Sequence, residues 1–560
     1  MPGILYHATG LQTNGQPYQN TYGRNFDLSA SLSYVTGAHA FKAGVSDTII
    51  LRDESLGDNN FHVSYVFNSP NTNPTVPTPT QIQQRTTPYL KAQRRPAGIG
   101  VFAQDKWTLN QLTLNLGVRF DYLDIYAPAL HLGPALLVPT RNIDLPETRL
   151  VDWKDITPRV AAAYDLFGNG KTALRASINK YVIAQGVQGP YGDAITPVNR
   201  LANVVTRSWG DSNRNLVPEC DLTDPQANGE CGRMSDINFG SATPSTTINP
   251  NVLNGWGARP NNWEFSSGIQ HQVLPRVSVD FGYFRRWFGN FAVTANRAVS
   301  ASDYTPFTIT APADARLPNA GLPVAGLFNL VPNQVGNVDN YFTFASDYGN
   351  QIQHWNGVDL TVNARLAPGV LLQGGMSTGK TVTDNCDLVA KLPGLLLGGN
   401  NLGVANANVW LPASFCHQQS PFLTQVKFLG SYSVPRIDVQ VSGSFQSIPG
   451  PLLSANTVLT NALVQPLIGR PLSGATTMTV NMAPPGSAFG ERLNQLDVRF
   501  AKILKFGGLK TSVNLDLYNL FNSSTVLAEL PTYTLATSTW RVPSTILTAR
   551  FAKISLQIDF

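Results

Sequence analysis

The residues from Gly374 to Thr381 have the spacing of a phosphate-binding loop. They read GGMSTGKT, which satisfies the pattern GxxxxGK followed by Ser or Thr. In a true phosphate-binding loop this pattern follows a buried strand and opens a helix whose N-terminal amides hold the phosphate. An apolar strand-like segment (370–372) precedes it here, but the residues that follow, VTDNCDLVAKLPG, read as a loop rather than an amphipathic helix. We therefore predict that this motif binds no nucleotide.

Four cysteines form two close couples in segments rich in Asn, Asp, Pro and Gly. An even count in loop-like segments predicts two disulfides, Cys220–Cys231 and Cys386–Cys416, in an oxidising compartment. Free thiols are the alternative. A zinc site is disfavoured because it needs four ligands at tight spacing and the seven His are scattered.

Tryptophans in or beside long polar segments are candidates for stacking on a ligand such as a sugar or siderophore. Packing within the loop is the alternative for each of them. The four candidates are Trp209, Trp256, Trp355 and Trp410.

The composition indicates what kind of fold carries these residues. Charged residues make up 13% of the 560 residues, about half the usual content, and no window approaches 18 uninterrupted apolar residues. The 47 Gly and 39 Pro argue against a helical bundle. The net charge is only +5 and no Lys/Arg cluster is present, so we expect no nucleic-acid partner.

Apolar and polar residues alternate over 9 to 13 positions in many segments, as in 112–122 and 358–366. Strands of about 10 residues, repeated this often, are typical of membrane barrels, whereas sandwich strands have about 5–6 residues. The predicted spans are 23–35, 39–51, 97–107, 112–124, 156–166, 172–183, 262–273, 277–289, 356–366, 370–380, 422–433, 437–447, 491–504, 509–520 and 549–560. We predict an all-β, antiparallel transmembrane β-barrel that occupies 1–560 as a single domain.

Short turns alternate with long connections, as outer-membrane barrels require. The expected extracellular loops are about 53–96, 125–155, 184–261, 290–355, 381–421, 448–490 and 521–548. Aromatic residues near strand ends suggest an interface girdle. They are Trp107, Tyr122, Trp153, Tyr164, Trp263 and Trp287.

The last strand has apolar residues at alternate positions and ends in an aromatic residue. These residues are Ile554, Leu556, Ile558 and Phe560. Such an ending looks like the signal that the outer-membrane assembly machinery recognises. The alternative is an edge strand of a soluble sheet.

Charged residues on the polar strand faces are expected to solvate the barrel lumen and to form interstrand ion pairs. They include Asp121, Glu264, Asp280, Asp359, Asp438, Asp497, Asp516, Arg119, Arg175, Arg365 and Arg499. We see no combination of Ser, His and Asp that identifies a catalytic triad. We therefore predict no enzyme activity and no cofactor.

Several segments resemble TonB-dependent outer-membrane receptors. The segment GIGVFAQDKWTLNQLTLNLGVRFDY (98–122) is similar to the hairpin FxQDxW…LTLNLGxRxD of that family, and 156–181 resembles the hairpin that follows it. The segment DLYNLFN (516–522) and the terminal Phe560 match its last strands. The style is similar to Oar-like receptors, which carry a carboxypeptidase-regulatory-like domain before the plug.

This resemblance implies a 22-stranded barrel with an internal plug and a TonB-contacting box, in the outer membrane of a Gram-negative bacterium. No segment matches a plug or a box, the strand count of 15 to 16 falls short of 22, and the first residues do not read as a signal peptide. We therefore expect that N-terminal strands and the plug are missing and that upstream sequence exists.

The function implied is energised uptake of a scarce, bulky solute: an iron chelate, an oligosaccharide or a peptide. The implied partners are outer-membrane lipid, the barrel assembly machinery, an extracellular solute and, for the full-length protein, the TonB complex. The alternatives are an adhesive or structural barrel protein, a plugless pore, and a non-functional gene fragment.

Overall fold

The structure, a computed structural model, describes residues 6–7, 18–57, 63–67, 79–189, 191–215, 217–243, 246–396, 409–506, 509–534 and 539–559. Every statement about structure below refers to these residues. No helix among them is long and apolar enough to cross a membrane.

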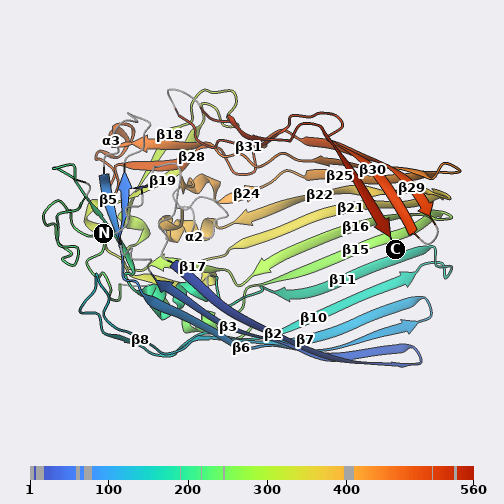
Figure 1. Ribbon diagram of the computed structural model, residues 1–560, viewed down its shortest axis with the longest axis horizontal. Helices are drawn as coiled ribbons and strands as arrows, with labels where there is room; N and C mark the ends of the chain where they lie inside the picture. Colours follow the sequence, from blue (N-terminus) through green and yellow to red (C-terminus); the bar gives the residue numbers. More distant parts are fainter. Residues whose placement is uncertain are drawn as a thin grey trace.

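Fifteen long strands form one curved antiparallel wall (Figure 1). Each strand pairs with the wall strands before and after it in the chain. In order they are β2 (Tyr18–Thr36), β3 (His39–Gly57), β6 (Tyr89–Leu109), β7 (Leu112–Ala127), β10 (Thr148–Asp165), β11 (Thr172–Val182), β15 (Asn261–Leu274), β16 (Val277–Gly289), β21 (Ile352–Ala367), β22 (Val370–Asp384), β25 (Leu423–Val434), β26 (Val439–Ile448), β29 (Leu493–Phe506), β30 (Leu509–Tyr518) and β33 (Phe551–Asp559).

Each predicted span coincides with one of these strands, because the alternation of apolar and polar residues marks the part with one apolar face. Several strands run further than predicted at their loop ends. β3 continues to Gly57 and β6 begins at Tyr89, so part of the expected loop 53–96 is strand. Pairing of the backbone continues there after the alternation has ended, which is why the sequence pattern missed it.

The outer face of the wall is apolar and open. Leu32 is 76% exposed, Val118 50% and Ile554 78%. The opposite face of the same strands carries Ser, Asn, Gln and charged side chains, and it lines the lumen. This division matches a membrane barrel, whose lipid-facing and lumen-facing residues alternate.

The two edge strands of the wall, β2 and β33, each have one wall neighbour. β2 pairs with β3 and β33 pairs with β30, and no ladder joins β2 to β33 among the described residues. Because fifteen strands alternate in direction, β2 and β33 run the same way. Although the wall curls like a barrel, it therefore has two free edges.

Short turns lie at one end of the wall, on the right in Figure 1, where the C-terminus also lies. Residues with positive φ make some of these turns tight, including Gly37 (φ 53°) and Asn110 (φ 48°). The opposite end carries the long connections, which fold into small sheets and short helices rather than remaining irregular.

These connections form a loop cap with its own secondary structure. Its sheets are β1 (Tyr6–His7), β4 (Val63–Phe67), β5 (Pro79–Arg85) and β12 (Val204–Ser208); β13 (Thr247–Ile248), β20 (Asn340–Phe344) and β17 (Ala292–Asn296); β18 (Tyr304–Thr310) and β19 (Pro323–Leu330); β23 (Val409–Trp410), β28 (Thr477–Asn481) and β27 (Asn456–Thr460); β31 (Val526–Glu529) and β32 (Pro543–Ile546); and β8 (Leu130–Leu132) and β9 (Ile143–Leu145). The helices α1 (Pro250–Leu253), α2 (Cys386–Lys391) and α3 (Asn461–Ile468) also belong to it.

Candidate functional site

The loop cap contains two disulfides. Cys220 is bonded to Cys231 and Cys386 to Cys416, with Cα–Cα distances of 5.9 and 4.9 Å. Both couples expected from the sequence are therefore disulfide-bonded, and the described residues contain no free cysteine.

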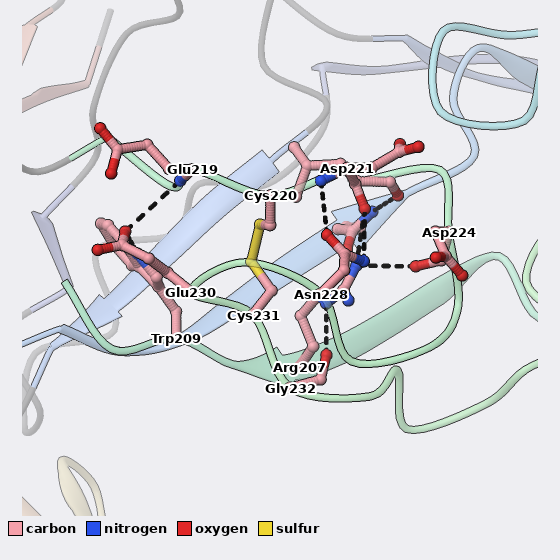
Figure 2. Close-up of a disulfide and its surroundings, with 12 residues drawn as sticks. Arg207, Trp209, Glu219, Cys220, Asp221, Asp224, Asn228, Glu230, Cys231 and Gly232 are labelled. Carbon is pink, nitrogen blue, oxygen red and sulfur yellow. Dashed lines mark hydrogen bonds between the residues drawn. A yellow bond between two sulfur atoms is a disulfide. The ribbon is translucent and has the colours of Figure 1, made fainter. Parts of the chain in front are cut away.

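A buried arginine organises the loop closed by the first disulfide (Figure 2). Arg207, on β12, is 2% exposed and its guanidinium donates to three backbone carbonyls of this loop and to one directly after it. The acceptors, with their distances, are Gly232 (2.8 Å), Asp221 (3.3 Å), Asp224 (3.1 Å) and Gln226 (2.7 Å). The guanidinium of Arg207 is thus the shared donor for all four carbonyls.

Carboxylates of this loop also accept hydrogen bonds from residues in the loop and close to it. Asp221 accepts from the hydroxyl and the amide of Thr223, and these bonds lower the pKa of its carboxyl. Glu230 accepts from the hydroxyl and the amide of Ser212, which likewise lower its pKa. Within the described part of the chain no group of three or more His, Cys, Asp or Glu could hold a metal ion.

Three connections share apolar cores in the cap. Leu327 of β19 packs with Val464 of α3 and Val480 of β28. Met482, after β28, packs with Trp540, from the connection between β30 and β33. These shared cores hold the connections against one another at this end of the wall.

Arginines reinforce the same contacts. Arg470 donates to the side chain of Asn329 (2.5 Å), to the Leu330 carbonyl (3.1 Å) and to Thr305 (3.1 Å), and so joins the end of α3 to the β18–β19 hairpin. Arg316 pairs with Asp314 at 2.6 Å and lies over the ring of Trp540. Bonds from Arg316 lower the pKa of the Asp314 carboxyl, and the Tyr533 hydroxyl adds another.

The polar inner face of the wall carries the ion pairs that the sequence predicted. Arg119 pairs with Asp121 on the same strand at 2.7 Å. Pairs between strands are Arg175–Asp280, Arg286–Glu264 and Arg499–Asp516. Arg365, Asp359, Asp438 and Asp497 form no ion pair among the described residues. Seven of the eleven charged residues predicted for the lumen are thus paired within the wall.

The motif from Gly374 to Thr381 lies entirely within β22, in the middle of the wall. A short helix, α2, does follow at Cys386, where the sequence predicted a loop, but it is separated from the motif by the end of the strand. Extended backbone cannot direct successive amides at one phosphate as a helix N-terminus does. The prediction of no phosphate-binding loop agrees with this geometry.

The chain matches a known protein family. The family described as outer membrane beta barrel domain matches residues 1–394 of the chain. The chain belongs to this family. Membership of this family places the chain in the outer membrane. Its all-β, antiparallel fold is the one that the sequence predicted.

Solved structures with a similar fold are long relative to this barrel. The outer membrane transporter YddB from Escherichia coli has 12% identity and a TM-score of 0.46, and the match covers 96% of this chain and 54% of that one. The ferripyoverdine receptor of Pseudomonas aeruginosa has 13% identity and a TM-score of 0.44, with 96% and 48% covered. The ferric preacinetobactin receptor BauA from Acinetobacter baumannii has 11% and 0.42, with 97% and 55% covered.

The chain therefore spans about half the length of these structures. No curated protein matches its sequence at a significant level.

The structure does not bring together the four tryptophans that the sequence suggested as ligand contacts. Trp209 is 2% exposed and packs against Tyr65 in the core of the small sheet, so its ring is not available to a solute. Trp410 packs against the core around Leu327. Trp355 lies on the lumen wall, and only Trp256, 64% exposed, presents its ring freely at the loop end.

The expected girdle is present in part. Trp263 and Trp287 stack on the outer face with ring centroids 6.5 Å apart. The prediction that Trp153 belongs to the girdle is wrong, because Trp153 is fully buried and its indole donates to the carbonyl of Val252 at 2.9 Å. It lies on the lumen side because it is three positions from the outward-facing Ile156, and the connection between β11 and β15 covers it there.

The apolar residues of the last strand point outward from the barrel. Ile554, Leu556 and Ile558 are 78%, 62% and 50% exposed. Phe560 lies outside the described residues. Sequence reasoning missed Arg207 and Arg470, because their partners are carbonyls and amides, which leave no charge pattern in the sequence.

Proposed function

We propose that this chain supplies the wall and loop cap of a TonB-dependent receptor that takes up a scarce, bulky solute. The observation that carries the proposal is the folded cap above a polar, ion-paired lumen. A cap with its own apolar cores holds its side chains in place before a ligand arrives, which reduces the entropy lost on binding. In this proposal the TonB complex of the inner membrane supplies energy by acting on a plug within the wall, as the family resemblance implies.

The two free edges of the wall support a larger barrel. In lipid, unpaired backbone groups cost several kcal/mol each, so a spanning sheet must close. Because β2 and β33 run the same way, antiparallel closure requires an odd number of further strands. Seven strands, which would complete the 22 of the resembled receptors, satisfy that condition.

A cross-linking experiment distinguishes this arrangement from direct closure. Cysteines introduced by Ser31→Cys on β2 and Gln557→Cys on β33 should fail to form a disulfide in outer membranes, because other strands lie between them. Efficient cross-linking within one chain would show that β2 and β33 meet, and would contradict the larger barrel.

The proposed transport is tested by deleting the gene and measuring uptake. Radiolabelled ferric siderophores, neutral oligosaccharides and short peptides should be supplied below micromolar concentration to deleted and complemented cells. High-affinity uptake of one class should be lost on deletion, and a protonophore should abolish it in complemented cells. Unchanged uptake of every probe would overturn the proposal.

The rival functions give different results. A defect in surface attachment without an uptake defect would identify an adhesive or structural protein. Large stepped conductance of the purified protein in planar bilayers would identify a plugless pore. Either result, without energised uptake, would replace the receptor proposal.

The remaining partners follow from the same proposal. The exposed apolar face would contact outer-membrane lipid, and the last strand would be recognised by the barrel assembly machinery. We propose no enzyme activity, no cofactor and no nucleic-acid partner. A hydrolase screen of the purified protein that detected turnover would contradict the first of these.

A further inference from the structure

A cleft of about 600 Å³ opens at the loop end of the wall. It lies where β14 (Asn254–Trp256), the connection between β16 and β17, and the segment after β20 meet. None of the described residues that line it is charged. They are amide side chains, aromatic rings, one serine and small residues, so the cleft is neutral although charged residues surround it in the cap.

Trp256 forms one side of this cleft on a rigid support. β14 pairs with β10 in parallel, with Trp256 beside Lys154, and the Gly257 amide donates to the Lys154 carbonyl at 2.9 Å. One edge of the indole rests against Phe120, with centroids 5.6 Å apart, while 64% of the residue remains exposed. The ring is thus held in place with a large free surface.

The backbone of Trp256 lies on the loop side of the Trp263–Trp287 pair. Trp263 pairs with Trp287 on one side and with Lys180 on the other. Because Arg159 pairs with Asn179, Lys180 is level with position 158 of β10. Trp256 is level with Lys154, about four residues further toward the loop end, on the order of 13 Å of extended strand. The ring itself reaches back to Phe120, which pairs with the outward-facing Ile156, so Trp256 lies at the loop-side margin of the girdle.

Amide side chains line the same cleft as the Trp256 ring. The side chain of Asn290 donates to the carbonyls of Gly257 and Arg259 and ties the two sides of the cleft together. The side-chain oxygen of Gln351 is buried and accepts no hydrogen bond from the residues that the structure describes. The exposed side chains of Asn251 and Asn350 form no hydrogen bond with other described residues. A buried acceptor without a partner calls for a donor from water or a ligand.

We propose that this cleft binds one ring of a neutral, polyhydroxylated solute, a sugar unit. Its apolar C–H face would stack on Trp256, and its hydroxyls would bond to Gln351, Asn350 and Asn251. Hydroxyls both donate and accept, which suits amides that offer both functions. A charged ligand gains no ion pair from this neutral lining and loses its hydration, so the cleft favours a neutral one.

The sugar could belong to a free oligosaccharide or to the lipopolysaccharide beside the barrel. Both present the same ring chemistry, and the experiment separates them. The site does not depend on the proposed uptake, because a sugar can bind here whether or not it is transported. Binding and uptake are measured separately, so failure of one is distinguishable from failure of the other.

Calorimetry on the purified full chain in detergent tests the site with maltohexaose, chitohexaose, xylohexaose and purified lipopolysaccharide as probes. We expect at least one probe to bind, with affinity reduced about tenfold or more by Trp256→Ala. Gln351→Ala should also weaken binding, whereas Trp256→Phe should retain most of it. Phe521→Ala is the matched control, because Phe521 is 57% exposed in the cap but lies outside the cleft.

Heat-modifiable migration on gels shows whether each variant is folded. Binding by a free hexasaccharide that is lost in the variants identifies a soluble ligand, and binding by lipopolysaccharide alone, with the same losses, identifies a membrane sugar. No binding by any probe would overturn the proposal. So would binding that Trp256→Ala and Gln351→Ala leave unchanged.

Discussion

The indole ring of Trp355, on β21, lies over Gly379 of the neighbouring strand β22. A Cβ atom at position 379 would overlap the six-membered part of this ring, and one at Gly357 would overlap it as well. The ring occupies the lumen face, where Trp355 pairs with Thr381. The glycine before Lys380, which completes the phosphate-loop pattern, is therefore explained by packing of an aromatic ring.

This contact predicts that Gly379→Ala destabilises the barrel. A methyl group forced against the ring should cost about 1–3 kcal/mol, as overpacking does elsewhere. The free energy of unfolding in urea, measured in lipid vesicles, checks it. Gly430→Ala is the matched control, since the nearest atom to a Cβ there is 3.8 Å away. Equal effects of the two substitutions would contradict the packing explanation.

Lys380→Ala should have no effect on nucleotide binding, because the motif is part of a strand. Lys380 instead lies 5.4 Å from the ring centroid of Phe422. Equilibrium dialysis with labelled ATP should detect no binding by either form. Affinity in the native chain that is lost in the variant would show that the motif does bind phosphate.

Arg207→Ala should loosen the loop between Cys220 and Cys231. The substitution leaves four carbonyls without their shared donor, which we expect to cost about 3 kcal/mol of local stability. Hydrogen exchange of residues 217–236 should accelerate while the wall strands remain protected. Arg233→Ala is the control, because Arg233 is exposed and close in sequence. Unchanged exchange in Arg207→Ala would mean that the disulfide alone holds the loop.

The contact between Asp314 and Tyr533 should persist in mild acid. Because bonds from Arg316 lower the pKa of Asp314, its contribution to stability is complete above the ordinary carboxyl range. That contribution is lost only as the pH falls through the lowered pKa. Emission from Trp540, which is 2% exposed in the same cluster, should therefore stay constant from pH 7 to about 4.

Asp314→Asn should weaken this cluster at every pH, because it removes the charge that Arg316 pairs with. Asp144→Asn is the matched control, since the Asp144 side chain is 88% exposed and lies outside the cluster. Quenching of the native chain's Trp540 emission already between pH 6 and 5 would contradict the direction of the pKa shift.

Ile554→Arg should impair insertion of the last strand, whereas Gln557→Arg should be tolerated. Ile554 faces outward and is 78% exposed, so a cation there would meet lipid at a cost of about 2–4 kcal/mol. Gln557 pairs with Ser512 on the polar lumen face. The amount of heat-modifiable protein in outer-membrane fractions checks both. Equal yields would show that the outer face of β33 is not lipid-exposed.

The sequence by itself determined the wall and its two faces. Alternation as in 112–122 depends only on neighbouring residues, since a strand turns successive side chains to opposite sides. The disulfide couples were also local, with separations of 11 and 30 residues. Fold class and strand positions could therefore be predicted without any knowledge of how distant segments meet.

The tertiary structure decided which tryptophans are buried, where the buried arginines find their acceptors, and that the wall has two free edges. Trp153 and Trp209 are covered by connections remote in sequence, and Arg470 contacts residues more than 130 positions away. The neutral cleft at Trp256 also requires three separate segments to converge. The physical reason is that backbone alternation is set within one strand, whereas burial and hydrogen-bond partners depend on the packing of loops against one another.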